Sequence, residues 1–393
     1  MKKLTSNKCF ILLVFLAFFG FSIGLFDNYR DLWISSNNIS TLTISHIKSI
    51  SYIITVLVLF FFTLKVSSSK LKNGITITIV LKMITSSILL CLNNTSNLFL
   101  IKFLMFFDIA FTQVIVSSIY PLMLKFARGD ELYTKKEVIE SLFNKLGFLL
   151  VSILLGKIIF GTVINYNICL LLSLIFTFIA FIIIINFEIE EKKESAVDIK
   201  EAIKYFNKNK VLYLFLITNL IASITWSSMI GMPLLTLTKT LNLSPKISSF
   251  LILGLGIISN LLAIIVVKYL RSKNDYINLF FKFGFRIIIY LLVFLTNDKL
   301  FLLISLITLL ITDCTYNFIF ASHFTNIIDE KYSLLLIVLK YCTSLIGNAV
   351  GVSICGLVFN LSIKYIALPA LIIGIIHYIL ASILVHKKRY SLI

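Results

Sequence analysis

ICLLLSLIFTFIAFIIII, the stretch from residue 168 to residue 185, is almost wholly apolar and contains no charged side chain. A run of about 18 such residues is long enough for a helix to cross the apolar core of a bilayer. Comparable stretches recur along the 393 residues, of which 59% are hydrophobic and 14% charged. A soluble domain has roughly 45–50% apolar and about 25% charged residues. The composition therefore excludes a water-soluble globular protein and predicts an all-α membrane protein.

Polar breaks divide the chain into twelve apolar runs. At about 20 residues per span, twelve spans leave room only for short loops and tails, so we expect no sizeable soluble domain. The predicted spans lie near residues 9–26, 44–66, 75–92, 98–125, 137–160, 165–187, 211–236, 246–268, 276–296, 299–320, 332–358 and 364–385.

Lysine and arginine are distributed unequally between the two sides of these spans. One side collects 23 of the 36 basic residues, whereas the other has only Arg30, Lys239, Lys246, Lys299 and Lys364. Basic loops stay in the cytoplasm, so both termini are predicted to be cytoplasmic in a multi-pass protein of the cell membrane. The excess of basic residues in the cytoplasmic loops explains the net charge of +18. No nucleic-acid partner is predicted.

A duplicated unit is indicated by landmarks that recur about 200 residues apart. The polar stretch 188–210 lies between the two copies, so we predict an N-terminal half at 1–187, a cytoplasmic linker at 188–210 and a C-terminal half at 211–393. The predicted fold is twelve transmembrane helices in two pseudo-symmetric six-helix halves. The matched landmarks include Lys82 with Lys282, Asp130 with Asp329, Gly147 with Gly347, and Gly156 with Gly356.

Two halves of six helices with a charged linker and internal termini resemble the major facilitator superfamily over essentially the whole chain. The stretch from Asp130-Glu131-Leu132 through Gly147 and Gly156, and its counterpart from Asp329-Glu330 through Gly347 and Gly356, are similar to the drug-efflux branch, including macrolide-efflux-like exporters. The approach to the seventh span, 203–210, is similar to the same branch. The resemblance implies a transporter whose spans 1, 4, 7 and 10 surround a central cavity.

Two acids lie deep within spans that the resemblance assigns to the cavity: Asp108 on span four and Asp313 on span ten. A carboxylate at this depth costs on the order of 2.5–3.5 kcal/mol, so it needs a partner, water or a task. We predict that both couple substrate movement to a proton. The alternative is a structural ion pair with Lys102, Arg286 or another basic residue. Thr312 and Tyr316 extend a polar stripe around Asp313 and join it as predicted site residues.

Span seven carries a polar and aromatic stripe that includes Asn219 and Trp226 at helical spacing, and span four offers Gln113 in a similar pattern. Such a face suits an amphipathic ligand. Hydrogen bonding between packed helices explains the same pattern equally well. The deep acids with Trp226 and Tyr316 favour a cationic or neutral amphipath, because cations bind aromatic faces.

Four charged residues near span ends are candidates for gating. Asp27 and Arg30 are i,i+3 neighbours that can pair at the outer end of span one, where Trp33 suits the headgroup belt. The alternative for this segment is an interfacial anchor. Lys145 and Lys340 lie just inside spans five and eleven, where snorkelling to the interface is the alternative. We expect the other span lysines, such as Lys82 and Lys282, to snorkel, and count Arg286 with them on a peripheral span.

No cofactor or metal site is predicted. The six cysteines and four histidines are scattered singly, without the spacing of metal ligands. Gly254-x-Gly256 lacks a third glycine and lies within an apolar span, and no GxxxxGK[ST] sequence occurs. An enzyme is not predicted, because membrane enzymes need reactive clusters on sizeable loops.

The predicted function is secondary active transport: proton-coupled efflux of a small amphipathic or hydrophobic compound by alternating access. Two alternatives stay open, an importer of a small polar solute and a non-transporting sensor or immunity protein that kept the fold. The predicted partners are a small-molecule substrate, protons and the lipid bilayer. We expect a monomer.

Overall fold

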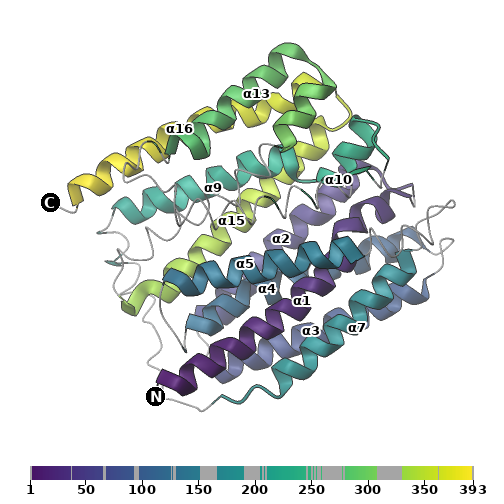
Figure 1. Cartoon of the computed structure of the whole chain (residues 1–393), viewed down its shortest axis with the longest axis vertical. Helices are drawn as coiled ribbons and strands as arrows, with labels where there is room; N and C mark the ends of the chain where they lie inside the picture. The colour runs from purple at the N-terminus through teal and green to yellow at the C-terminus, as the bar shows by residue number, and fades with distance from the viewer. Residues whose placement is uncertain are drawn as a thin grey trace. The chain divides into compact units, whose positions relative to one another are not determined.

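A computed structural model describes residues 2–36, 38–64, 68–92, 97–124, 126, 130–150, 166–189, 204–205, 208, 210–244, 247–248, 251, 254, 258, 277, 279–307, 330–361 and 363–391. Every labelled element in this part of the chain is a helix (Figure 1). Eight of the described helices are long and apolar enough to cross a membrane. The predicted all-α class is confirmed.

The chain forms two compact units. Unit 1 contains residues 1–40, 50–196 and 249–253, and unit 2 contains residues 41–49, 197–248 and 254–393. The α2 helix, Thr41–Leu64, therefore contributes its first nine residues to unit 2 and the rest to unit 1.

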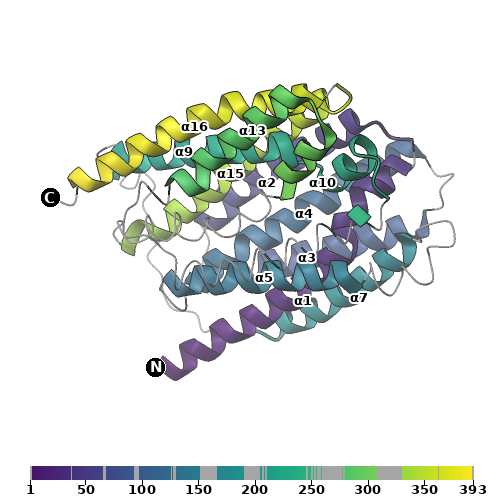
Figure 2. The ribbon, with the colours of Figure 1, turned by 45° about the horizontal axis from the view of Figure 1, so that its top comes forward.

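In unit 1, α1 packs against α5 and α7, while α3 packs against α4 and α7 (Figures 1 and 2). The bounds are α1 Lys2–Ser36, α3 Ser68–Cys91, α4 Leu98–Leu124, α5 Asp130–Leu150 and α7 Tyr166–Ile185. Hydroxyl groups join α1 to α7: Ser22 Oγ lies 2.6 Å from Thr177 Oγ1 and 3.0 Å from Ser173 Oγ. Such small polar contacts hold helices together where water is absent.

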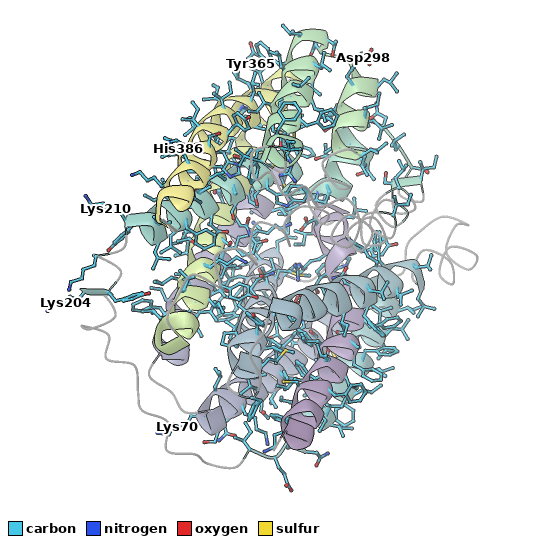
Figure 3. The ribbon with its side chains drawn as sticks, turned by 60° about the vertical axis from the view of Figure 1, so that its left-hand side comes forward. Lys70, Lys204, Lys210, Asp298, Tyr365 and His386 are labelled. Carbon is cyan, nitrogen blue, oxygen red and sulfur yellow. The ribbon has the colours of Figure 1, made fainter. Side chains whose placement is uncertain are left out.

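In unit 2, α9 packs against α15 and α16, and α13 packs against α16. The bounds are α9 Lys210–Ile230, α10 Pro233–Leu235, α13 Phe285–Thr296, α15 Glu330–Val358 and α16 Ile363–Ser391, with short π-helical segments at Thr236–Thr240 and Phe280–Gly284. Figure 3 shows the basic side chains Lys204 and Lys210 projecting away from the ribbon near the start of α9.

Glycines allow the closest approaches between helices in both units. On α1, a Cβ at Gly20 would lie 2.9 Å from the Glu140 carbonyl oxygen, and one at Gly24 would overlap the Asn144 carbonyl oxygen of α5. On α15, a Cβ at Gly347 would lie 2.5 Å from the Leu220 carbonyl oxygen, and one at Gly351 would lie 2.6 Å from that of Ile224. Small residues at four-residue spacing are typical of tightly packed membrane helices.

Two predicted span ends are wrong. The first span was expected to stop at residue 26, but α1 continues to Ser36, because Asp27 and Arg30 pair with each other instead of breaking the helix. The seventh was expected to reach residue 236, but α9 ends at Ile230 ahead of Pro233. A proline lacks the backbone N–H that would continue the helical ladder.

Lys48 on α2 meets the interrupted end of α9. Its Nζ donates a hydrogen bond of 3.0 Å to the carbonyl of Gly231, and the neighbouring Ser49 hydroxyl donates to the carbonyl of Ala349 at 2.9 Å. Carbonyls at a helix C-terminus lack partners within their helix, and a cation suits that end of the helix dipole. Lys48 therefore caps α9.

Spans five, eight, nine and ten are described only in part. The start of span five lies in α5, most of span nine lies in Phe280–Thr296, and span ten is described only to residue 307. Most of span eight falls outside the described residues. The six-helix count of each half stays a prediction.

Candidate functional site

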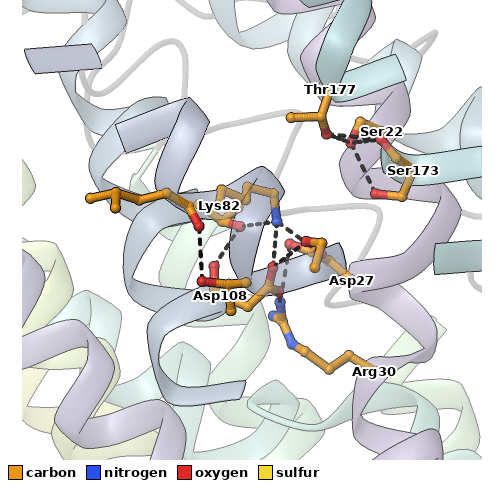
Figure 4. Close-up of polar contacts among 11 residues, drawn as sticks. Ser22, Asp27, Arg30, Lys82, Asp108, Ser173 and Thr177 are labelled. Carbon is orange, nitrogen blue, oxygen red and sulfur yellow. Dashed lines mark hydrogen bonds and ion pairs between the residues drawn. The ribbon is translucent and has the colours of Figure 1, made fainter. Parts of the chain in front are cut away.

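Asp108 lies in a cluster of buried charges within unit 1 (Figure 4). It occupies α4 ten residues after Leu98, about 15 Å along the helix at 1.5 Å per residue, and is 0% exposed. Its Oδ1 accepts hydrogen bonds from Lys82 Nζ at 2.9 Å and Ser86 Oγ at 3.2 Å. Its Oδ2 accepts one from Arg30 Nη1 at 2.9 Å. Both carboxylate oxygens therefore have strong donors.

Lys82 is held inside the protein, and the prediction that it snorkels is wrong. Its side chain is 2% exposed, and its Nζ donates to Asp108 Oδ1 and, at 2.8 Å, to Thr112 Oγ1. It also lies 3.9 Å from Asp27 Oδ1. An acid and a hydroxyl within reach of the amine remove the need to extend the stem toward water.

Arg30 links α1 to this cluster. Its Nη1 lies 3.2 Å from Asp27 Oδ2 in the predicted i,i+3 pair and 2.9 Å from Asp108 Oδ2. Trp33 does not lie in an exposed belt, because it is 5% exposed and packs edge-on against Phe26 at a ring distance of 6.2 Å. The segment belongs to a buried part of α1 and is not an interfacial anchor.

The cluster contains two acids and two bases, with Asp31 close by on α1. Asp27 and Arg30 are each 7% exposed at the side chain, and Asp31 is 6% exposed. Asp27 Oδ1 and Arg30 Nε are buried and have no hydrogen-bond partner among the described residues. Burying an ion costs several kcal/mol unless a partner compensates, so the four charges of Asp27, Arg30, Lys82 and Asp108 depend on one another.

The contact of Asp27 and Arg30 with the Asp108 cluster was not predicted from the sequence, and neither were the contacts of Ser86 and Thr112. A pattern in the sequence does point to these contacts. Lys82-x-x-x-Ser86 and Asp108-x-x-x-Thr112 each place two polar groups on one face of consecutive spans. Such faces on neighbouring membrane helices are expected to meet.

In unit 2, the polar stripe of α9 is used in helix packing. Asn219 Nδ2 donates to the carbonyl of Lys340 at 3.0 Å and lies 2.9 Å from the hydroxyls of both Thr343 and Ser344. Ser227 donates to Asn348 Oδ1 at 2.7 Å. These contacts all reach α15. The structure therefore brings Asn219 against α15, which was the alternative to a ligand-binding role.

Trp226 lies beneath the guanidinium of Arg286. The Arg286 Cζ atom is 5.7 Å from the Trp226 ring centroid, and Arg286 is 6% exposed. The expectation that Arg286 lies on a peripheral, lipid-facing position is wrong. The cation–π contact with Trp226 gives the guanidinium a place inside unit 2.

Among the other predicted site residues, Lys340 takes part in the contacts above through its carbonyl, which accepts from Asn219. Gln113 is half-buried on α4 beside Thr112. Lys145 on α5 and Lys340 on α15 are also half-buried. Asp313, Thr312 and Tyr316 lie outside the described residues. Within the described residues, no group of three or more His, Cys, Asp or Glu could hold a metal ion.

The helices and their burial define the class of protein. Eight described helices can cross a membrane, and large apolar side chains such as Phe99 and Leu357 are exposed along them. The structure is that of a polytopic helical membrane protein with the major facilitator fold.

The named structures that it resembles are transporters. It is similar to the human organic anion transporter MFSD10 (TETRAN), with a TM-score of 0.67 and 9% sequence identity over 96% of this chain and 99% of that chain. It is also similar to the nucleoside transporter NupG, with a TM-score of 0.64 and 14% identity over 98% of this chain and 100% of that chain. No protein-family model matches the sequence, and no curated protein matches it.

Proposed function

We propose that this protein is a secondary active transporter that exports a small amphipathic or hydrophobic compound in exchange for protons. The observation that carries the proposal is the buried cluster of Asp27, Arg30, Lys82 and Asp108 in a chain with a transporter fold. Ionisable groups inside a membrane protein are costly and generally mark ion or substrate pathways. Alternating access would let the cluster face each side of the membrane in turn.

The energy for this transport would come from an ion gradient. No ATP-binding loop sequence is present in the chain. One proton moving down a potential of 100 mV supplies about 2.3 kcal/mol. In the proposal, the Asp108 cluster couples transport in the N-terminal half and Asp313 does so in the C-terminal half.

We propose the following roles for the remaining predicted residues. Asp27 and Arg30 close the cluster from α1, and Lys145 and Lys340 act near the ends of their spans. Trp226, with Gln113, Thr312 and Tyr316, contacts substrate, while Asn219 positions α9 on α15. The protein works as a monomer in the cell membrane with both termini in the cytoplasm, in the manner of the drug-efflux branch.

A second candidate is transport of organic anions. It is favoured by Arg286, which is buried over the Trp226 ring and therefore places a positive charge inside unit 2. It is also favoured by the similarity to a protein described as an organic anion transporter. An aromatic ring beside a guanidinium suits a flat anion.

Uptake by everted membrane vesicles tests both candidates. Vesicles with the protein receive either ethidium, a hydrophobic cation, or fluorescein, an organic anion, with an acidic lumen or with the pH gradient collapsed by nigericin. We expect gradient-dependent ethidium uptake above that of vesicles without the protein. Uptake of fluorescein alone would favour the second candidate, and accumulation only in right-side-out vesicles would indicate an importer.

A further inference from the structure

The two acids of the buried cluster are bound very differently. Asp108 accepts three side-chain hydrogen bonds, from Lys82 and Ser86 on Oδ1 and from Arg30 on Oδ2. A proton on Asp108 would remove the counter-charge that both cations share at 2.9 Å. Arg30 and Lys82 would then be left with their longer contacts to Asp27, at 3.2 Å and 3.9 Å, and a buried cation that loses its closest counter-charge is strongly destabilising. Asp108 therefore suits a permanent negative charge.

Asp27 makes longer contacts with the two cations than Asp108 does. Its Oδ2 lies 3.2 Å from Arg30 Nη1, and its Oδ1 is 3.9 Å from Lys82 Nζ and has no hydrogen-bond partner in the part of the chain that the structure describes. Both neighbouring cations make their shorter contact with Asp108. Neutralising Asp27 would leave each of these cations paired. A proton on the unbonded Oδ1 would also lower the cost of burying that oxygen as part of an anion.

The charged groups that could titrate together with Asp27 are those on the helices that pack around it. Arg30 and Asp31 lie on α1, and Lys82 and Asp108 face it from α3 and α4. On α5, which also packs on α1, the nearest described charged residues along the helix are Lys145 and the Glu140–Lys136 pair at 2.7 Å. The α7 helix, Tyr166–Ile185, carries no Asp, Glu, Lys, Arg or His. Asp31 is thus the natural comparison for Asp27.

Asp27 is also close to one end of its span. It precedes Ser35, the last residue of the apolar span of α1, by eight residues, which is about 12 Å at 1.5 Å per residue. Asp108 lies about 15 Å from the corresponding end of α4. Asp27 is therefore the acid of the pair that lies nearer to the water at that end.

We propose that Asp27 is the proton-carrying residue of unit 1 and that Asp108 is its fixed counter-charge. This inference rests on the proposed function, because it names the group that exchanges the transported proton. A proton from water forms an O–H bond on Asp27 Oδ1, and the carboxylate becomes a neutral carboxylic acid. The Asp27–Arg30 ion pair is lost while Arg30 keeps Asp108. Release of the proton to water on the other side restores the pair.

Infrared difference spectroscopy tests the assignment without a substrate. The full chain in lipid vesicles is taken from about pH 9 to about pH 3, a window that extends below the ordinary carboxyl pKa of about 3.9. We expect a carboxylic-acid C=O band that grows as the pH falls, is absent in Asp27→Asn, and remains in Asp31→Asn. In Asp27→Glu the band should persist at a shifted frequency. An unchanged band in Asp27→Asn, or its loss only in Asp31→Asn, would overturn the proposal.

Transport measurements distinguish an error in this inference from an error in the proposed function. In Asp27→Asn we expect exchange of radiolabelled ethidium for unlabelled ethidium to continue, because exchange requires no net proton movement, while gradient-driven uptake falls at least tenfold. Gradient-driven uptake that equals wild type in this variant would refute the role of Asp27 alone. A wild-type protein that moves neither ethidium nor fluorescein would refute the proposed function, whatever the infrared result.

Discussion

At the scale of single residues, the Asp108 side chain connects three helices of unit 1. One carboxylate compensates cations from two other helices, Arg30 on α1 and Lys82 on α3. Its removal therefore affects three helices at once. Removal of a hydroxyl donor to the same carboxylate affects only one bond.

Asp108→Asn should destabilise the protein by about 3–5 kcal/mol, because two buried cations lose their counter-charge. Ser86→Ala is the matched control, since it removes a single hydrogen bond to the same oxygen and should cost about 1 kcal/mol. Thermal unfolding in detergent measures both. Equal unfolding temperatures for the two variants would contradict the central position of Asp108.

Arg286 leads to a second residue-scale prediction through the internal repeat. Asp108 follows Lys82 by 26 residues, and Asp313 follows Arg286 by 27. Asp313 lies outside the described residues, but this spacing predicts the same pairing between the third and fourth spans of the second half.

A double-mutant cycle tests this pairing. Arg286→Met and Asp313→Asn should show a stability coupling of about 0.5–3 kcal/mol. Lys282→Met with Asp313→Asn is the control, because Lys282 stands one turn earlier and is the counterpart of Lys82 at an offset of 200. Coupling to Lys282 and not to Arg286 would show that the repeat is in the other register.

At the scale of helices, close approach through glycine fixes the pairs α1–α5 and α9–α15. Gly24 on α1 faces the backbone of Asn144 and Phe148, and Gly351 on α15 faces that of Ile224 and Ser228. A side chain at either position meets backbone, which has little room to move. The packing of these helices depends on the missing Cβ atoms.

Gly24→Ala should therefore cost about 1–3 kcal/mol through overpacking. Gly254→Ala is the control, because a Cβ there would meet no atom of the described residues within 4 Å, and alanine is otherwise the better helix former. Gly24→Ala should therefore have a lower thermal unfolding temperature than Gly254→Ala. A Gly24→Ala protein as stable as wild type would mean that α1 and α5 separate more easily than this packing implies.

The pattern of apolar and charged residues predicted where the helices lie better than it predicted which residues contact one another. The span at 332–358 ends at Val358 as expected, because an apolar run with polar flanks specifies a helix locally. The end of α1 and the burial of Lys82 and Arg286 were missed, because they depend on partners far away in sequence. A lysine in a span looks the same in sequence whether it snorkels or pairs.

At the scale of the whole molecule, the distribution of basic residues predicts on which side of the membrane each loop lies. Arg30 drops out of the outer group, because it is buried in α1, which leaves four basic residues there and strengthens the asymmetry. The ends of adjacent helices in unit 2 agree with it: α9 begins at Lys210, and the apolar span of α16 that packs on it ends at Lys387.

Single-cysteine labelling checks the predicted topology. Ser69→Cys and Ser244→Cys, each in a chain with its native cysteines replaced by serine, should react with a membrane-impermeant maleimide from opposite sides of the membrane. Intact cells should label Ser244→Cys, and everted vesicles should label Ser69→Cys. Labelling of both positions from outside would contradict a twelve-span arrangement with cytoplasmic termini.

The most direct measurement is simultaneous recording of dye and proton movement by the purified protein in liposomes. The lumen is made acidic and holds a trapped pH-sensitive dye, and ethidium is added outside. We predict ethidium uptake together with alkalinisation of the lumen, both absent in protein-free liposomes and both reduced at least tenfold by Asp27→Asn. Ethidium uptake at the same rate with and without the gradient, and with no change in lumenal pH, would contradict proton-coupled transport.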